Sequence, residues 1–376
     1  MKVLIAPDAF KESASAMQVA EAIKTGWQKD RPNDTIQLFP VSDGGEGLLE
    51  VLKETCKLKM YQAEVTRLDG KKILASYGIL TEQKIAIIES ASAIGLDFIP
   101  ADKRNPALMT SFGVGELILA TLDQDIEKII IGLGGSGTND GGAGLLQALG
   151  VKLLDKNKNH IQPGGIHLKK LDQIDITQLD PRLKEISIQI ASDVTNPLLG
   201  ENGATRVFGP QKGATQEMLV ELEKSMTIYG EKLDIFAARK ISLIEGSGAA
   251  GGIAAGLIAI QNAEIVSGAD LVIELSGLKK QLANTDLVII GEGRIDAQSM
   301  MGKIPVRVAA EAKKAGASVL AIAGSTRIEN KLAYQNGIDA VFPIIPELTD
   351  SATIFSQTNY NLMRTAENIA KLTLLF

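Results

Sequence analysis

The sequence is poor in three residue types on which many enzymes and binding proteins depend. Cys56 is the single cysteine among 376 residues, so no disulfide can form within the chain and an oxidising compartment is not implied. Aromatic residues make up 4%, which leaves little material for stacking against nucleobases or sugar rings. His160 and His167 are the only histidines, and neither lies in a pattern typical of catalysis.

Long apolar runs and clusters of positive charge are also missing. The longest stretch of small apolar residues, 248–260, is shorter than a membrane span, and the apolar N-terminal stretch is too short for a signal peptide. The net charge is −6 and no run of Lys or Arg is long enough to form a basic patch, which argues against a nucleic-acid surface. We therefore expect a cytoplasmic monomer or homodimer that acts on a small molecule and binds neither membranes nor nucleic acids.

Both ends of the chain alternate short apolar strands with helices. Five apolar runs are predicted to be strands, at 3–6, 36–39, 287–290, 319–322 and 340–344. A helix begins at Ser15, which forms a capping box with Gln18, and another helix covers 304–316. This alternation predicts a doubly wound, Rossmann-like α/β domain with a parallel sheet, built from residues 1–58 and 281–376.

The middle of the chain follows a different plan. Residues 61–90 contain three predicted strands joined by short polar turns, which is typical of an antiparallel meander and not of a βαβ crossover. A helix is expected at about 114–122 and a further strand at 186–191. We therefore expect a second α/β domain with a mixed sheet, inserted at residues 59–280.

Seven glycines lie within residues 129–144, IIIGLGGSGTNDGGAG, directly after an apolar run. Gly132, Gly134 and Gly137 fit the pattern G-x-G-x-x-G of dinucleotide-binding proteins. The acidic residue that this pattern requires further on would be Asp155, which lies in a polar turn instead of at the end of a second parallel strand. A Walker loop is absent, because no lysine follows the glycines. An NAD(P)-dependent oxidoreductase is therefore one open interpretation of this stretch.

Anion binding is the interpretation that the residue types favour. Gly134 and Gly135 allow the backbone to approach a phosphate closely, and hydroxyl or amide groups are added by Ser136, Thr138 and Asn139. The start of the following helix would add its positive N-terminal end. The alternative is a tight turn between a strand and a helix, in which the glycines serve close packing alone.

Four further stretches place charged groups directly after predicted strands, where open α/β sheets bind ligands. They are PDAFKES at 7–13, PVSDGGEG at 40–47, ASDVTNP at 191–197 and GEGRID at 291–296. Each of them alone is explained equally well by turn and capping chemistry. Together they supply the carboxylates and cations that phosphoryl transfer requires.

Two other stretches carry features of the same kind. Lys212, in FGPQKG, is expected in a turn and is a further candidate cation for phosphoryl transfer. Residues 246–252, GSGAAGG, fit a second anion cradle and close helix packing through small residues equally well.

Eight ordered motifs give the chain a family resemblance. They are APDAFKESASA, PVSDGGEG, TSFGVGELI, GLGGSGTNDGGAG, SDVTNPLLGENGA, FGPQKGA, GSGAAGG and GEGRIDAQS followed by GK and P. The sequence resembles the bacterial glycerate kinase family over residues 1 to about 345. The resemblance implies ATP-dependent phosphorylation of D-glycerate, with 2-phosphoglycerate as the product. It also implies two α/β domains with the active site in a cleft between them.

On chemical grounds we assign the proton transfer to a carboxylate that follows a strand. Asp193 is the predicted general base for the glycerate hydroxyl, and Asp43 is the alternative. Lys11 and Arg294 are assigned to the substrate carboxylate and the transferred phosphoryl group.

The predicted cofactors are ATP and Mg²⁺. Asp8, Glu292 and Asp296 are the candidates for Mg²⁺, directly or through water, because this ion prefers a few carboxylates together with phosphates. The source of the positive charge that a Walker lysine would supply stays open among four residues: Lys11, Lys212, Arg294 and Lys303. A small-anion sensor without activity is a third open interpretation, beside the kinase and the oxidoreductase.

Overall fold

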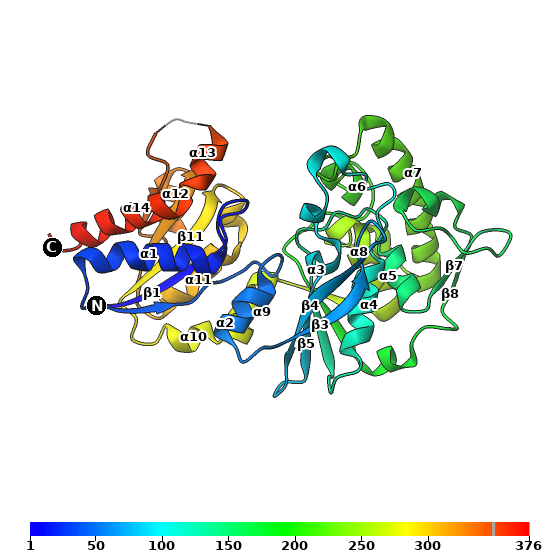
Figure 1. Cartoon of the computed structure of the whole chain (residues 1–376), viewed down its shortest axis with the longest axis horizontal. Coiled ribbons are helices and arrows are strands. Elements are labelled where there is room, and N and C mark those ends of the chain that lie inside the picture. The colour runs from blue at the N-terminus through cyan, green and yellow to red at the C-terminus, as the bar shows by residue number, and fades with distance from the viewer. Residues whose placement is uncertain (348–349, 376) are drawn as a thin grey trace. The chain divides into compact units, whose positions relative to one another are not determined.

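A computed structural model describes residues 1–347 and 350–375, and its chain forms two compact units (Figure 1). Of the described residues, the first unit contains 1–43, 50–57, 268–347 and 350–375, and the second contains 44–49 and 58–267. The sequence-based limits at 58 and 281 stay a prediction about independently folding domains. Within the described residues, no helix combines the length and apolarity needed to cross a bilayer.

The first unit is built on a five-stranded parallel sheet with the order β13-β12-β11-β1-β2. Its strands are β1 (Lys2–Pro7), β2 (Thr35–Leu38), β11 (Leu287–Ile295), β12 (Ser318–Thr326) and β13 (Ala340–Pro343). Its helices are α1 (Ala16–Asp30), α9 (Gly268–Ser276), α10 (Leu278–Gln281), α11 (Ile304–Lys314), α12 (Asn330–Gln335), α13 (Ser351–Ser356) and α14 (Thr358–Leu372). The helix α2 (Leu48–Thr55) begins in the second unit and ends in the first.

Alternation along β1 separates the two apolar layers that cover this sheet. Val3 and Ile5 pack in a cluster with residues of α1 and α14, which lie side by side (Figure 1). Leu4 and Ala6 pack in another cluster with residues of α9, α10 and α11. Because side chains alternate across a strand, the sheet is covered by helices on both faces, as expected for a doubly wound fold.

The strand order reverses between β1 and β11. From β1 the chain proceeds to β2 on one side, whereas β11, β12 and β13 follow one another on the other side. At such a switch point the connections leave the sheet in opposite directions, so a crevice opens beyond the carboxyl ends of the two strands. Asp8 follows β1 directly, and Glu292 lies near the corresponding point of β11.

The second unit holds a six-stranded mixed sheet with the order β10-β9-β6-β5-β4-β3. Its strands are β3 (Lys59–Thr66), β4 (Lys72–Leu80), β5 (Ile85–Glu89), β6 (Lys128–Gly132), β9 (Ser187–Ala191) and β10 (Glu264–Val266), and β7 (Lys152–Leu154) pairs with β8 (Gln173–Asp175). The first three form an antiparallel meander, and β5, β6, β9 and β10 are parallel.

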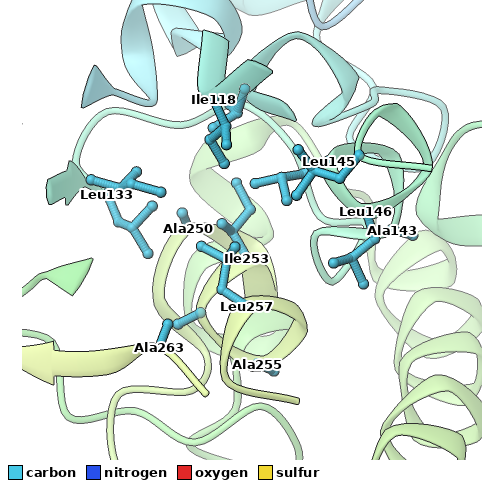
Figure 2. Packing of buried hydrophobic residues seen from close by; sticks show 14 of the residues in the cluster. Ile118, Leu133, Ala143, Leu145, Leu146, Ala250, Ile253, Ala255, Leu257 and Ala263 are labelled. Carbon is cyan, nitrogen blue, oxygen red and sulfur yellow. The ribbon is translucent and has the colours of Figure 1, made fainter. Parts of the chain in front are cut away.

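The helices of the second unit pack on this sheet around one large apolar core. They are α3 (Ala91–Ile94), α4 (Phe112–Thr121), α5 (Ala143–Ala148), α6 (Ala204–Phe208), α7 (Gln216–Ala237) and α8 (Ala249–Gln261). Figure 2 shows Leu145 of α5 and Ile118 of α4 pointing toward Ile253 of α8. The predicted fold class is therefore confirmed: one parallel sheet built from both chain ends, and one mixed sheet.

Candidate active site

Three carboxylates meet at the switch point of the first unit. The Asp8 amide donates a hydrogen bond to the Gly291 carbonyl oxygen at 2.9 Å, which places Asp8 beside the end of β11. On the other side of β1, the Val41 amide donates to the Pro7 carbonyl oxygen at 2.9 Å, which brings the segment with Asp43 alongside. Burial and then the negative charges of Asp43 and Glu292 raise the pKa of Asp8 well above its usual value. The cluster therefore favours a bound proton or cation.

Lys303 neutralises part of the negative charge of this carboxylate cluster. Its Nζ lies 2.9 Å from Glu292 Oε1. Burial alone would lower the pKa of Lys303, but the neighbouring Glu292, with which it pairs, raises it. Glu292 is 8% exposed, and its second oxygen, Oε2, has no hydrogen-bond partner among the residues that the structure describes. A buried carboxylate oxygen without a donor is costly, so this atom is suited to an additional cationic partner.

The remaining predicted residues of the first unit lie around this cluster. Lys11 is exposed, and its charge acts on Asp8 to lower the pKa of that carboxyl against the effects of burial and Asp43. Arg294 is paired with Asp296, at 3.2 Å between Nε and Oδ2. Asp296 also accepts hydrogen bonds from the amides of Gln298 and Ser299, at 3.0 and 3.2 Å. The Asp296 carboxylate therefore already has hydrogen-bond and ion-pair partners. The Arg294 side chain is about half exposed, so it stays accessible to a ligand.

No ready-made metal cage exists in the described part of the chain. No group of three or more His, Cys, Asp or Glu side chains is arranged there to hold a metal ion. Mg²⁺ does not need such a cage, because it usually keeps several waters and uses one or two carboxylates with substrate phosphates. The assignment of Asp8, Glu292 and Asp296 to Mg²⁺ stays a prediction.

In the second unit the glycine loop follows β6 at the carboxyl edge of the sheet. A Cβ on Gly134 would lie 2.7 Å from the Glu46 nitrogen, so only glycine fits at this approach. The next residue, Gly135, is exposed and has φ of +66°, which side chains disfavour. Across residues 1–347 and 350–375, the amides of Gly134, Gly135 and Ser136 donate to no other part of the chain. Consecutive amides of this kind form a concave anion site.

The loop is tied down by its neighbours. The Leu96 amide donates to the Gly135 carbonyl oxygen at 2.8 Å, and the Gly137 amide donates to the Ile94 carbonyl oxygen at 2.8 Å. Thr138 and Asn139 are fully buried, and Asn139 Nδ2 donates to Thr205 Oγ1 at 3.0 Å. Of the five predicted nucleotide-binding residues, Gly134 is half-buried and Gly135 is exposed, whereas Ser136, Thr138 and Asn139 are buried.

Asp140 organises the start of α5. Its fully buried carboxylate accepts hydrogen bonds from the Ser111 amide and hydroxyl at 2.8 and 2.9 Å, and from the amides of Gly142 and Gly144 at 3.2 Å. The Leu145 amide donates to Ser111 Oγ at 3.0 Å. The amides at this helix start are thus occupied by the protein itself. The predicted contribution of the helix start to phosphate binding is not supported, and sequence reasoning missed this capping role because Ser111 is distant in sequence.

Asp193 lies at the same sheet edge as the glycine loop. β6 and β9 are parallel, and their last residues, Gly132 and Ala191, are partners in register. Asp193 follows β9 by two residues and is exposed. The general-base role of Asp193 stays a prediction, as does the alternative role of Asp43.

The stretch 246–252 is closely packed. Ala250, Gly251 and Gly252 have left-handed backbone angles, with φ of 53°, 68° and 92°, and all three are buried. The Gly141 amide donates to the Gly251 carbonyl oxygen at 2.9 Å, and a Cβ on Gly251 would overlap the Thr138 carbonyl oxygen. Of the two interpretations of this stretch, the structure favours close packing, here against the backbone of the glycine loop.

We expect Gly251→Ala to destabilise the protein by about 1–3 kcal/mol more than Gly70→Ala, because of overpacking. Gly70 is the matched control in the same unit, since its φ is +86° but a Cβ there would meet nothing within 4 Å. Both variants share the cost of a left-handed alanine, about 1–2 kcal/mol. Urea unfolding of both variants measures the difference, and equal losses would show that the contact with Thr138 has no weight.

A glycine loop at one sheet edge, together with carboxylates, lysines and an arginine at another, has the chemical features of a phosphotransferase. The chain matches the glycerate kinase family over residues 3–374. It is 46% identical over 370 residues to the glycerate 2-kinase of Escherichia coli K12, covering 98% of this chain and 97% of that protein. It is 45% identical over 371 residues to the glycerate kinase of Haemophilus influenzae, covering 99% and 98%.

A solved structure agrees with these relatives. A crystal structure from Salmonella typhimurium LT2, assigned to a glycerate kinase 2, is similar with a TM-score of 0.84 and 43% identity, covering 100% of this chain and 98% of that one. The chain belongs to the glycerate kinase family. It is therefore a kinase, a phosphotransferase that acts on a glycerate hydroxyl, and the prediction from the motifs is confirmed. The oxidoreductase and sensor interpretations gain no support.

Proposed function

We propose that the protein transfers the γ-phosphoryl group of ATP to D-glycerate and forms ADP and 2-phosphoglycerate, with Mg²⁺ as the cofactor. The observation that carries the proposal is that one chain holds two features: a glycine loop with three amides that make no hydrogen bond within the described residues, and a carboxylate cluster with two cationic neighbours, Lys11 and Lys303. The name of the Escherichia coli relative supports the 2-hydroxyl as the acceptor.

Each group has a role that matches its chemistry. The amides of Gly134 to Ser136 bind nucleotide phosphates, and Lys11 and Arg294 neutralise the glycerate carboxylate and the transferred group. Asp193 accepts the proton of the attacking hydroxyl, with Asp43 as the alternative. A positioned base matters because the uncharged hydroxyl is a weak nucleophile.

The carboxylate cluster fits a divalent cation. Glu292 Oε2 lacks a hydrogen-bond donor among the described residues, and the charges of Asp43 and Glu292 disfavour ionised Asp8 unless positive charge is added. Asp8 and Glu292 would hold Mg²⁺, and Asp296 would act through water because its carboxylate is already paired with Arg294. When bound, Mg²⁺ would neutralise charge on the phosphates.

One assay tests the proposal. The protein is incubated with ATP, Mg²⁺ and D-glycerate, and ADP is measured while phosphorus NMR distinguishes 2-phosphoglycerate from 3-phosphoglycerate. We expect ADP only when D-glycerate is present and only before EDTA is added. ADP formed equally without glycerate would contradict the acceptor, and the 3-phospho product would contradict the position of transfer. The same preparation, sized by light scattering, tests the expected monomer or homodimer, and cell fractionation tests the expected cytoplasmic location.

A further inference from the structure

A lysine is buried against the glycine loop, directly beside the exposed Gly135. Lys212 ends the 3₁₀ turn η5 (Pro210–Lys212) and is 3% exposed. Its Nζ donates hydrogen bonds to Ser136 Oγ at 3.1 Å and to the Thr138 carbonyl oxygen at 2.8 Å. The side chain thus reaches the loop from a segment 76 residues beyond Ser136 and 74 residues beyond Thr138 in the sequence.

The direction of these hydrogen bonds determines what Ser136 can do. An ammonium group has donors only, so Ser136 Oγ must accept from Lys212. The proton of the Ser136 hydroxyl is therefore left for another acceptor. Ser136 adjoins the exposed Gly135, whose amide, like those of Gly134 and Ser136, makes no hydrogen bond within the described residues.

The ammonium of Lys212 also lacks a partner of opposite charge. Within residues 1–347 and 350–375, no carboxylate lies within ion-pair distance of its Nζ. Asp140 is the acidic group that acts on it, but the oxygens of Asp140 are occupied by Ser111, Gly142 and Gly144. The Arg104 guanidinium, which donates to the Gln211 carbonyl oxygen of the same turn at 3.4 Å, is itself paired with Asp97. A buried charge without a partner is costly, so the surroundings of this ammonium are suited to an anion.

We propose that Lys212 is a positioning residue for the glycine loop, and that it supplies from beneath, through Ser136, the positive charge for the phosphate bound by Gly134 to Ser136. This inference rests on the proposed function and deepens it. In a Walker loop a lysine reaches the phosphates directly. Here Lys212 polarises the Ser136 hydroxyl, which donates to the phosphate. The positive charge of Lys212 therefore acts on the phosphate although the ammonium is shielded from solvent.

The proposal has a consequence for pH dependence. Burial lowers the pKa of Lys212 to about 8, although Asp140 opposes the shift. A bound phosphate favours the protonated lysine, so nucleotide affinity is full below this pKa and declines as the pH rises above it. If only the protonated form binds, the decline reaches about tenfold per pH unit. Nucleotide phosphates are already fully ionised in that range, since their last pKa is about 6.

Lys212→Met tests the proposal, because methionine is of similar length and has no charge. MgADP is titrated calorimetrically into the wild type and the variant from about pH 7 to 9.5, a range that spans the expected lysine titration. We expect the variant to bind MgADP about 10–100-fold more weakly near pH 7, as for the loss of a charged hydrogen bond. We also expect its affinity to be independent of pH. Lys184→Met, at an exposed lysine of the same unit, is the matched control and should behave as the wild type.

The unfolding midpoint without nucleotide separates this role from a structural one. Since Lys212→Met removes a buried unpaired charge, we expect a midpoint near that of the wild type, together with loss of the rise that MgADP produces in the wild type. A lower midpoint with retained affinity and retained pH dependence would overturn the proposal and leave Lys212 as a structural tether. The glycerate assay is a separate readout. If the wild type forms no phosphoglycerate, the proposed function is contradicted. If the wild type forms phosphoglycerate and Lys212→Met binds MgADP with normal affinity, only the role of Lys212 is contradicted.

Discussion

Asp193→Asn will lower kcat for glycerate phosphorylation by roughly 10²–10⁴-fold, the range for removal of a positioned general base. The KM for glycerate should change little, because the base acts on the hydroxyl proton in the transition state and contributes little to ground-state binding. Asp193 is exposed and follows β9, so the substitution should leave the fold intact. Steady-state kinetics with both substrates, together with circular dichroism of the variant, measure this.

Asp43→Asn is the companion experiment, since Asp43 is the alternative base. Turnover of Asp193→Asn near that of the wild type, together with a loss in Asp43→Asn, would transfer the role to the carboxylate cluster of the first unit. A strong rise in KM alone, in either variant, would instead indicate substrate binding.

Asp140→Ala will destabilise the protein by about 3–5 kcal/mol, because it leaves buried donors without an acceptor. The carboxylate accepts four hydrogen bonds from Ser111, Gly142 and Gly144, and its side chain is fully buried. The substitution destabilises the glycine loop and the start of α5 together, so we expect activity to be lost along with the folded structure. Urea unfolding with far-ultraviolet circular dichroism gives the change in free energy.

Asp155→Ala is the matched control for this prediction. Asp155 also accepts backbone hydrogen bonds, from Asn157 at 2.8 Å and Asn159 at 2.9 Å, but its site is open to water. We expect a loss below about 1 kcal/mol, because water replaces the carboxylate there. Comparable losses in both variants would show that burial of the acceptor does not decide the effect.

Local pattern was sufficient to predict most strands and helices. The capping box at α1 is present, with the Ser15 amide donating to Gln18 Oε1 at 2.9 Å and the Ser15 hydroxyl accepting from the Gln18 amide. The apolar runs that are expected to be strands overlap β1, β2, β11, β12 and β13, and the meander is β3 to β5. These features depend on residues close in sequence, where period and capping carry the information.

The details of the site depend on contacts that no local pattern contains. Lys212 could be named as one of four possible cations, but its place beneath Ser136 depends on the packing of segments 76 residues apart. The engagement of Asp140 by Ser111 spans 29 residues. The motif suggested that the helix start was open to phosphate, and tertiary contacts had already filled it.

The tethering of the glycine loop has a consequence for the entropy of binding. Three backbone hydrogen bonds fix the loop: the Leu96 amide donates to it, and two of its own amides donate to the carbonyl oxygens of Ile94 and Gly251. The Lys212 ammonium donates two more hydrogen bonds to the loop. Ordering a residue costs about 1–2 kcal/mol, and in this loop that cost falls on folding. Phosphate binding should therefore lose little backbone freedom, so that weak individual amide contacts add up to a usable affinity.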